Sequence, residues 1–450
     1  MTVALIILGA GKGTRMNSAL PKVLHPIAGG PLLVHAMKSG ASLNPARTVV
    51  VAGHGAELVE KAALAWDPDV TVVLQTEQNG TAHAVAQAKD ALSDFDGDAI
   101  VLYGDTPFIA PETLEAMVAA RAAHDVVVLG FEAADPGRYG RLVTDGDALD
   151  RIVEFKDATD EERAITLCNS GVIAADRKTL FDLIDAVGND NASGEYYLTD
   201  IIGIARARGL SATVVRCDEA ETLGINSRVE LAAAEDAFQT RARIAARDDG
   251  VAMAAPDTVY FAHDTVVGRD AIIEPNVVFA PGVTVESGAT IRAFSHLEGC
   301  HVARDAVVGP YARLRPGTEL SEGVKVGNFV EIKNAQVAEG AKVNHLTYIG
   351  DADIGARANI GAGTVTCNYD GFFKHKTTIG ADAFIGSSTM LVAPVTIGEN
   401  ALTGSGSVIT EDVPSGDLAV ARGRQVNKPG LAAQLKDKLR AAKAKLAKGA

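Results

Sequence analysis

A six-residue period in the second half of the chain constrains its fold more than any other feature. Apolar residues, all aliphatic except Phe279, recur at every sixth position over residues 267–297 and, after a slip of five, over residues 302–332. The pattern continues through residues 337–360 and returns over residues 379–409, where Thr403 breaks the apolar rule. Each hexad would form one flat side of a coil, with its aliphatic residue pointing inward and stacking on its copies in neighbouring coils. The period therefore predicts a parallel β-helix.

The hexads are interrupted by the stretch "TVTCNYDGFFKHKT", residues 364–377. A polar and aromatic excursion from a solenoid often carries function. Because Phe372 and Phe373 stand side by side within it, we expect them to pack against a neighbouring surface, such as that of another subunit.

The first half of the chain, up to about Gly250, alternates apolar strands with helical patterns. We expect strands over residues 3–8, 47–54, 70–75, 99–105 and 125–133, and helices over residues 31–43, 56–66, 81–92 and 111–124. Continuous β-branched runs that alternate with helices predict a Rossmann-like α/β domain with a mostly parallel sheet covered on both faces. Ligands of such sheets bind at the carboxyl ends of the strands.

A chain of 450 residues is too long for a single core. We predict the α/β domain over residues 1–226, a charged connecting helix over 227–248, the β-helix over 249–428 and a basic helix over 429–450. For the basic helix we favour a solvated cap on the last coil. A lid over an anionic ligand is the alternative, and a nucleic-acid tail fits least well.

The stretch "LGAGKGTRMNSALPK", residues 8–22, has the composition of a phosphate-binding loop that follows a strand. It is not a dinucleotide loop, because Thr14 stands where the third glycine belongs, and it is not a P-loop, because Ile6 stands where the first glycine belongs. What remains is a backbone that can approach an anion closely, with Arg15 and Lys22 to neutralise it. The alternative is an ordinary turn with solvated charges.

Asp105 ends the apolar run "IVLYGD" and so belongs to the same edge of the predicted sheet as this loop. A phosphate loop with a carboxylate beside it indicates phosphoryl or nucleotidyl transfer assisted by a divalent metal.

Composition argues against several other classes of protein. A net charge of −15 argues against a nucleic-acid binder, and no apolar run is long enough to span a membrane. Residues 3–8 lack a basic region and a cleavage site, so we interpret them as a strand and not a signal peptide. The four cysteines are widely scattered without a C-x-x-C pair, which argues against zinc and disulfide frameworks and fits a reducing cytoplasm.

Seven motifs of the first half, in this order, resemble the sugar-1-phosphate nucleotidyltransferases: "LGAGKGTRMNSALPK", "QNGTAHAV", "YGDTP", "EFKDAT", "NSGV", "GEYYLTD" and "GINSR". With the hexapeptide half, "VEIKNA" and "KVNHLTYIGDADIGARANIGAGTVTCNYDG", essentially the whole chain resembles a family of bifunctional enzymes of bacterial cell-wall precursor synthesis. These enzymes combine an N-acetylglucosamine-1-phosphate uridyltransferase with a glucosamine-1-phosphate N-acetyltransferase. The chain departs from the family at Gly9, where alanine is usual, and in its tail, which does not match the family.

The resemblance implies a nucleotidyltransferase domain followed by a left-handed β-helix acetyltransferase domain. The protein would acetylate glucosamine-1-phosphate with acetyl-CoA and then transfer uridyl from UTP, with Mg²⁺, to make UDP-N-acetylglucosamine and pyrophosphate. This product supplies peptidoglycan, lipopolysaccharide and lipid A precursors. The resemblance further implies a cytoplasmic homotrimer with acetyl-transfer sites built between subunits, and partners that are small-molecule substrates rather than nucleic acid or membrane.

The resemblance also implies roles for residues of the first half. Arg15 and Lys22 would contact the phosphates during catalysis, and Asp105 with Asn226 would bind Mg²⁺. The nucleotide would be held by Leu8, Gly9, Ala10, Gly11, Lys22, Gln75, Gly80, Thr81, Tyr103, Gly104 and Asp105. The sugar side would be lined by Gly140, Glu154, Asn169, Thr199 and Asn226.

In the second half, acyl transfer to an amine needs a base with a pKa near neutrality. His345 is that base by family likeness; the alternative is an ordinary surface histidine. Arg315, Lys333, Tyr348 and Asn359 would bind the amino-sugar phosphate, and Glu331 would orient the amine. Acetyl-CoA would contact Ala362, Asn368, Tyr369, Ser387, Ser405 and Arg422.

Two rival interpretations differ in function. One is another nucleotidyltransferase, of the ADP-glucose kind, that uses its β-helix only for regulation; "NHLTYIG" and "CNYDG" argue against it. The other is a non-catalytic sugar-nucleotide sensor or assembly subunit. Retention of Arg15, Lys22, Asp105 and Asn226 argues against the sensor, and a turnover assay distinguishes the two.

Overall fold

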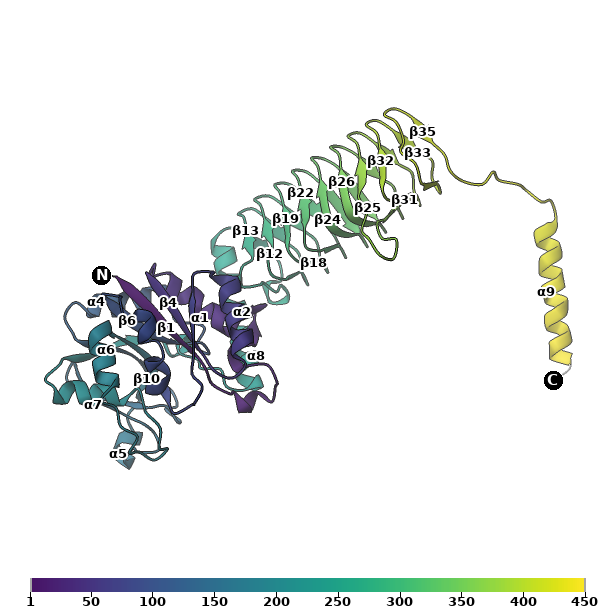
Figure 1. The fold of residues 1–450 in the computed structure, drawn as a ribbon. Coiled ribbons are helices and arrows are strands. Elements are labelled where there is room, and N and C mark those ends of the chain that lie inside the picture. The colour runs from purple at the N-terminus through teal and green to yellow at the C-terminus, as the bar shows by residue number, and fades with distance from the viewer. Residues whose placement is uncertain (1, 449–450) are drawn as a thin grey trace. The chain divides into compact units, whose positions relative to one another are not determined.

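A computed structural model describes residues 2–448 (Figure 1). The chain divides into two compact units, which are described here one at a time. The first contains residues up to Asp248 together with Tyr260–Thr265 and Phe279–Pro281. The second contains Asp249–Val259, Val266–Val278 and the chain from Gly282 onward.

The first unit is built on one twisted sheet. Its strands are β1 (Val3–Gly9), β4 (Arg47–Ala52), β5 (Thr71–Leu74), β6 (Asp98–Tyr103), β7 (Val126–Glu132), β8 (Arg141–Asp145), β9 (Ala148–Val153), β10 (Leu167–Asp176) and β11 (Ala212–Cys217). They lie in the order β5-β4-β1-β6-β10-β7-β11-β9-β8. The five predicted strands are β1, β4, β5, β6 and β7. Strands β5, β4, β1 and β6 pair in parallel, whereas β10 runs antiparallel between β6 and β7.

Helices pack on the sheet and connect its strands. They are α1 (Leu32–Ala41), α2 (Ala56–Trp66), α3 (Thr81–Ala86), α4 (Pro111–Ala120), α5 (Asp160–Arg163), α6 (Arg177–Ile184), α7 (Asp200–Ala207) and α8 (Arg228–Asp248). Short 3₁₀ turns are η1 (Thr14–Met16), η2 (Lys22–Leu24), η3 (Asp90–Leu92) and η4 (Glu219–Glu221), and β2 (Pro26–Ile27) pairs with β3 (Gly30–Pro31). The prediction of one continuous helix over residues 81–92 is wrong, because α3 ends at Ala86 and the separate 3₁₀ turn η3 follows it.

Both faces of the sheet are buried, which explains why its strands are apolar throughout. Along β1, Ile6 packs into one hydrophobic core with Val101. Its neighbour Ile7 packs into a second core with Val50 and Leu33 of α1. Because successive strand residues point to opposite faces, a strand covered on both sides needs an unbroken apolar run.

The predicted connecting helix, residues 227–248, packs onto the first unit as α8. Its Ala234 joins a small apolar cluster with Ile27, Leu32 and Phe108. Gln239 of α8 donates to the carbonyl of Phe261 at 2.7 Å and accepts from its amide at 2.9 Å. A stretch predicted as a connector is therefore part of a folded unit.

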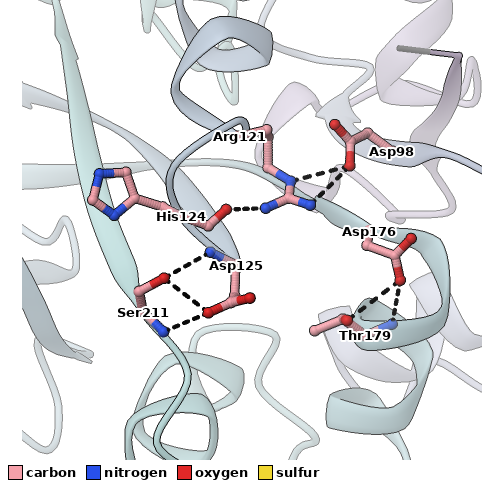
Figure 2. A network of polar contacts seen from close by, with 7 residues as sticks. All are labelled: Asp98, Arg121, His124, Asp125, Asp176, Thr179 and Ser211. Carbon is pink, nitrogen blue, oxygen red and sulfur yellow. Dashed lines mark hydrogen bonds and ion pairs between the residues drawn. The ribbon is translucent and has the colours of Figure 1, made fainter.

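A polar network closes the edge of the sheet where β6, β7 and β11 begin (Figure 2). Arg121 donates from two nitrogens to one carboxylate oxygen of Asp98, at 2.9 and 3.1 Å, and also to the carbonyl of His124. Asp125 accepts from the amide and the hydroxyl of Ser211, each at 2.8 Å. These hydrogen bonds lower the pKa of Asp125. The network lies at the opposite end of these strands from the loop over residues 8–22.

The second unit is a parallel β-helix, as predicted. One face is formed by β12 (Ala252–Met253), β14 (Ile272–Ile273), β17 (Thr290–Ile291), β20 (Val307–Val308), β23 (Lys325–Asn328), β25 (Lys342–His345), β27 (Asn359–Ile360), β30 (Phe384–Ile385), β33 (Leu402–Thr403) and β35 (Leu418–Ala419). The long strands β24 (Glu331–Val337) and β26 (Tyr348–Ile354) join the remaining strands into one continuous sheet. Those are β13 (Val266–Val267), β15 (Val278–Phe279), β16 (Thr284–Val285), β18 (His296–Leu297), β19 (Cys300–Val302), β21 (Arg313–Leu314), β22 (Thr318–Leu320), β28 (Val365–Cys367), β29 (Thr377–Ile379), β31 (Met390–Val392), β32 (Val395–Ile397) and β34 (Val408–Ile409).

The hexad residues point inward as predicted. They are buried from Ile273 to Ile409, and Val267 in an early coil is half-buried. Thr403, which breaks the apolar rule, is buried as well, and its hydroxyl accepts a hydrogen bond from the amide of Gly386 at 3.0 Å. A buried hydroxyl is tolerated where a backbone donor satisfies it.

The predicted excursion over residues 364–377 is shorter in the structure. Strand β28 stays in the coil, with Thr366 fully buried. Its hydroxyl accepts from the amide of Gly350 at 2.8 Å and donates to the carbonyl of Gly350 at 3.1 Å. Only residues 368–376 leave the coil as a loop.

Helix α9 (Leu431–Lys448) follows the β-helix, and the last two residues of the predicted basic tail lie outside the described residues. Over the described part of the chain, no helix has the length and apolar character that crossing a membrane requires.

Candidate active sites

The first candidate site is a cavity of about 270 Å³ at the carboxyl ends of β1 and β6. Nine of the eleven residues expected to bind nucleotide line it: Leu8, Ala10, Gly11, Lys22, Gln75, Gly80, Thr81, Tyr103 and Asp105. The amide of Gly104 donates to the carbonyl of Leu8 at 2.9 Å, which holds the ends of β6 and β1 together. The structure therefore gathers residues from five separate stretches of the sequence around one space.

Lys22 lies between the two expected metal ligands. Its ammonium group forms an ion pair with Asp105 and donates to the side-chain oxygen of Asn226 at 3.1 Å. The main chain sets this arrangement, because the amide of Ile225 donates to the carbonyl of Asp105 at 3.0 Å. Glu230 in the first turn of α8 accepts from the amide of Asn226 at 2.6 Å.

These contacts test whether the residues fit a magnesium ion. Oxygens of Asp105 and Asn226 converge on one positive charge, and a carboxylate with an amide oxygen is a normal partial ligand set for Mg²⁺. Among the described residues, no group of three or more His, Cys, Asp or Glu side chains could hold a metal. The residues thus fit an ion that takes its remaining ligands from phosphate and water.

A second cavity, of about 450 Å³, shares Thr81, Tyr103 and Glu195 with the first. Glu154, Asn169 and Thr199, which are expected on the sugar side, line it. The Thr199 hydroxyl donates to Glu154 at 3.2 Å, and burial raises the pKa of this carboxyl. Burial and the nearby carboxylates of Glu154 and Asp105 likewise raise the pKa of Tyr103.

Gly140 is not among the described residues that line this cavity, but it supports two of them. A Cβ at this position would lie 3.6 Å from both Asn169 Cβ and Glu154 Oε1. The Gly140 carbonyl also accepts from the amide of Asn169 at 2.8 Å.

Besides Gly140, four of the expected residues of the first half are not among the described residues of either lining: Gly9, Gly104, Arg15 and Asn226. Arg15 is exposed on η1. Gly9 is buried in β1, where an added Cβ would lie 3.4 Å from the carbonyl oxygen of Val51, an ordinary contact. Alanine therefore fits at position 9, and the departure from the family pattern does not alter the loop.

Gly80 needs to be glycine for a structural reason. Its φ is +116°, and a Cβ would overlap the backbone of Tyr196. The carbonyl of Gly80 accepts from the side chain of Gln75 at 3.2 Å, which joins two expected nucleotide contacts.

The second cavity contains residues that sequence reasoning did not single out. They are Arg138, Phe155, Lys156, Ser193, Glu195 and Tyr197. Phe155 and Lys156 stand in "EFKDAT", and Glu195 and Tyr197 in "GEYYLTD". For these four the signal was present in the motifs, but only the folded chain shows which motif members face the cavity; Arg138 and Ser193 stand outside the motifs and carried no such signal.

In the second unit, His345 stands in a column of residues from successive coils. Strand pairing sets Asn328 opposite His345. The amide of Gly363 donates to the carbonyl of His345 at 3.1 Å, and that of Ser388 donates to the carbonyl of Ala362 at 2.7 Å.

The column continues toward the C-terminal coils. The amide of Gly406 donates to the carbonyl of Ser387 at 2.8 Å, and Arg422 donates from its guanidinium to the carbonyl of Ser405. Four of the six residues expected to contact acetyl-CoA, namely Ala362, Ser387, Ser405 and Arg422, therefore follow His345 along one edge of the β-helix.

A second column holds the expected amino-sugar residues. Strand pairing sets Arg313 beside Glu331 and Glu331 beside Tyr348 in successive coils, and the flanking residues Arg315 and Lys333 lie in adjacent coils. Arg315 donates to Glu331 at 2.8 Å. Asn359, however, lies on the face that carries His345, in register with Lys342.

The side chains of Tyr348 and Asn368 both lie against Gly350. A Cβ at Gly350 would overlap the Tyr348 hydroxyl and would lie 2.7 Å from the Asn368 side-chain nitrogen. Asn368, itself buried, donates to Asp351. A proposed sugar contact and a proposed acetyl-CoA contact are thus adjacent in one chain.

The loop over residues 368–376 is held from within by Asp370. One carboxylate oxygen accepts from the amides of Phe372 and Phe373 at 2.8 and 2.7 Å, and the other contacts His375 at 2.7 Å. The amide of Phe373, the His375 ring and the amide of Phe372 lower the pKa of Asp370 to about 2. Phe372 and Phe373 are exposed in the single chain.

Comparison with known proteins places the chain in a family. Residues 5–171 match MobA-like NTP transferase domains, and residues 264–299 and 376–411 match bacterial transferase hexapeptide repeats. The "Bifunctional protein GlmU" of Roseobacter denitrificans is 68% identical over 100% of both chains. Proteins of the same name from Cereibacter sphaeroides and a Ruegeria species are 69% and 67% identical, each over 100% of this chain and at least 99% of the relative. The chain therefore belongs to the GlmU family of bifunctional transferases, which join a nucleotidyltransferase domain to a hexapeptide-repeat acetyltransferase domain.

Proposed function

We propose that the two sites of this bifunctional enzyme carry the two reactions that make UDP-N-acetylglucosamine. The β-helix acetylates glucosamine-1-phosphate with acetyl-CoA, and the α/β unit then transfers uridyl from UTP to the acetylated sugar phosphate. This proposal is carried by the convergence of three side chains at the carboxyl edge of the sheet: Lys22 and Asp105, which line the first cavity, and Asn226, which accepts a hydrogen bond from Lys22. Free cysteines throughout the described chain support a reducing, cytoplasmic location.

In uridyl transfer, a phosphate oxygen of the sugar attacks the α-phosphorus of UTP in line and pyrophosphate leaves. The protein contributes position and charge. Asp105 and Asn226 would hold Mg²⁺, which when bound neutralises phosphate charge. Lys22 is already at these ligands and can turn its ammonium group to the phosphates. Arg15, which is exposed on η1, would contact the phosphates from the solvent side.

The sugar enters the second cavity in this scheme. Asn169 and the Thr199–Glu154 pair offer both donors and acceptors to hydroxyl and acetamido groups. Because Tyr103 and Thr81 line both cavities, nucleotide and sugar meet at that shared wall.

In acetyl transfer, the amine nitrogen of the sugar attacks the thioester carbonyl carbon, the carbon–sulfur bond breaks and CoA leaves as a thiolate. The attacking nitrogen becomes positively charged and passes its proton to His345. Arg315 and Lys333 supply the positive charge for the sugar phosphate, and Glu331, held by Arg315, faces the same column.

Acetyl-CoA would lie along the column that leads from His345 to Arg422. Ala362, Ser387 and Ser405 are small, so an extended ligand can approach the backbone. Arg422 at the end of the column would neutralise phosphate charge on CoA.

We further propose that three copies assemble along a ridge formed by Phe294, Tyr311, Phe329 and Leu346. These side chains are 48–64% exposed, and the first three stack with ring centroids 4.9 and 5.4 Å apart. All four have φ between +51° and +60°, which is costly for bulky residues and favours a role for their side chains.

The occupant of this ridge is a second copy of the chain, because the ridge adjoins the acetyl-transfer site. Phe329 follows Asn328 and Leu346 follows His345, so packing around a threefold axis would place a neighbouring copy beside His345. Tyr311→Lys should abolish both the trimer and acetyl transfer while sparing uridyl transfer. Light scattering of a wild-type monomer that still acetylates would contradict the proposal.

One assay tests the proposed reactions directly. The full-length protein is incubated with UTP, acetyl-CoA, glucosamine-1-phosphate and Mg²⁺, and the products are separated by chromatography. UDP-N-acetylglucosamine should form only when all three substrates are present. Product formation without acetyl-CoA, or none with all three, would contradict the proposal.

A further inference from the structure

Asn328 contacts the side chain of His345 from the neighbouring coil. The two residues are directly paired between β23 and β25, and His345 Nδ1 lies 3.1 Å from the side-chain oxygen of Asn328. Asn328 is half-buried on the column that carries the acetyl-CoA contacts. A polar side chain in this place can decide which nitrogen of the imidazole carries the proton.

The main chain on both sides of this contact is held in place. The amide of Leu346 donates to the carbonyl of Asn328 at 3.1 Å. The hydroxyl of Thr347 donates to the carbonyl of His345 at 2.6 Å. What remains free is the rotation of the imidazole ring, and the Asn328 contact restricts it.

Strand spacing keeps Asn328 at this distance. The preceding residue, Gly327, has no room for a side chain, because a Cβ there would overlap the carbonyl group of Asn344. The backbones of β23 and β25 therefore approach closely one residue before the Asn328–His345 pair.

We infer that Asn328 is a positioning residue for acetyl transfer, and this inference rests on the proposed role of His345 as the base. An amide oxygen can only accept a hydrogen bond, so Nδ1 of His345 must carry the proton. Nε2 then keeps its lone pair and is the nitrogen that removes the proton from the attacking amine. Asn328 thus fixes both the tautomer and the ring plane before the substrate binds.

Two substitutions separate this role from simple packing. Asn328→Leu keeps much of the volume and removes the acceptor, whereas Asn328→Asp keeps an acceptor of similar shape. Asn328→Leu should lower kcat for acetyl transfer at least about tenfold, part of the roughly 10²–10⁴-fold that a positioned general base contributes, with the KM values for acetyl-CoA and glucosamine-1-phosphate nearly unchanged. Asn328→Asp should retain most of kcat. Gln336→Leu, on the exposed side of β24, is the matched control and should change neither quantity.

The outcomes distinguish failure of this inference from failure of the proposed function. If His345→Ala abolishes acetyl transfer and Asn328→Leu leaves kcat unchanged, the positioning role is wrong and the base assignment stands. If Asn328→Asp is as slow as Asn328→Leu, the amide nitrogen and not the oxygen faces the ring, and the inferred tautomer is wrong. If His345→Ala keeps more than about a tenth of the activity, the base assignment itself fails.

If the Asn328 variants do not fold, a measurement on the wild-type protein still tests the inference. Nitrogen-15 NMR of protein labelled in its histidine rings, with the His345 signals assigned by difference from His345→Ala, reports the tautomer directly. The inference requires a protonated Nδ1 and an unprotonated Nε2 in the neutral ring. The opposite assignment would overturn it.

Discussion

The ammonium nitrogen of Lys22 lies 3.1 Å from the side-chain oxygen of Asn226 and pairs with Asp105 at the same time. The three residues come from η2, from the turn after β6 and from the segment before α8, and both members of the ion pair are mostly buried. A buried cation between two oxygen ligands occupies the position that the proposed function assigns to metal and phosphate.

Lys22→Met should therefore lower kcat for uridyl transfer by about 10²–10³, the typical loss when one hydrogen-bond donor that stabilises a transition state is removed. Acetyl transfer should be unchanged, because the substitution lies in the other unit. The matched control is Lys12→Met, an exposed lysine of the same loop, which should keep uridyl transfer within about twofold, as expected of a solvated surface charge. Equal losses in the two variants would show that net charge of the loop, and not the position of Lys22, matters.

Gly9→Ala should leave both activities unchanged and should be neutral or stabilising. The added methyl group makes only ordinary contacts in β1, and alanine restricts the unfolded chain, which contributes about 0.4–1 kcal/mol to the free energy of unfolding. Gly80→Ala is the contrasting variant, because its backbone has φ +116° and no room for a Cβ. Chemical denaturation should rank Gly9→Ala at or above wild type and Gly80→Ala below it; the reverse order would contradict the account of this loop.

Arg121→Ala should destabilise the first unit without touching its site. Arg121 and Asp98 are 9% and 6% exposed, so removing the guanidinium leaves a buried carboxylate without its partner (Figure 2). Breaking a buried pair costs about 3–5 kcal/mol, whereas Lys178→Ala, which removes an exposed pair on α6, should leave the free energy of unfolding nearly unchanged. Urea unfolding measures both.

Uridyl transfer per folded molecule should be normal in each variant, since the network lies at the far end of the strands. A specific loss of kcat in Arg121→Ala would contradict this.

The loop over residues 368–376 should stay ordered as the pH falls from neutrality to about 4. The lowered pKa of Asp370, about 2, means that its stabilising contribution is fully present above the ordinary value of 3.8 and is lost as the pH falls through about 2. Hydrogen-exchange protection of the Phe372 and Phe373 amides, corrected for intrinsic rates, should be constant from pH 7 to pH 4. Asp370→Ala should lose that protection at every pH and weaken acetyl-CoA binding. Protection that fades between pH 6 and pH 5 in the wild type would point to a different anchor.

Much of the fold was predictable because its signals are local. The hexad period specified which residues of the β-helix face inward, and the predicted burial of these residues is confirmed. Thr366 was missed as a core position because its hydroxyl is satisfied by Gly350, sixteen residues earlier and one coil away. A hydrogen-bond partner in another coil cannot be predicted from the local sequence pattern.

Contacts between residues far apart in the sequence also limited what could be predicted of the two sites. Motif resemblance pointed to Lys22, Asp105 and Asn226 separately, and only folding shows that one ammonium group contacts both oxygens. Asn328 carried no signal of its own, because its contact with His345 depends on the register between coils. The roles of the individual site residues remain predictions until variants are assayed.

The central claim is that two independent sites carry the two reactions, and a single product analysis tests it most directly. Asp105→Asn and His345→Ala are each incubated with UTP, acetyl-CoA, glucosamine-1-phosphate and Mg²⁺, and products are quantified by mass spectrometry. Asp105→Asn should accumulate N-acetylglucosamine-1-phosphate without UDP-N-acetylglucosamine. His345→Ala should accumulate neither, yet should form UDP-N-acetylglucosamine at the wild-type rate when N-acetylglucosamine-1-phosphate is supplied. If Asp105→Asn still makes the nucleotide sugar, or if either substitution removes both reactions from a folded protein, the assignment of one reaction to each site is wrong.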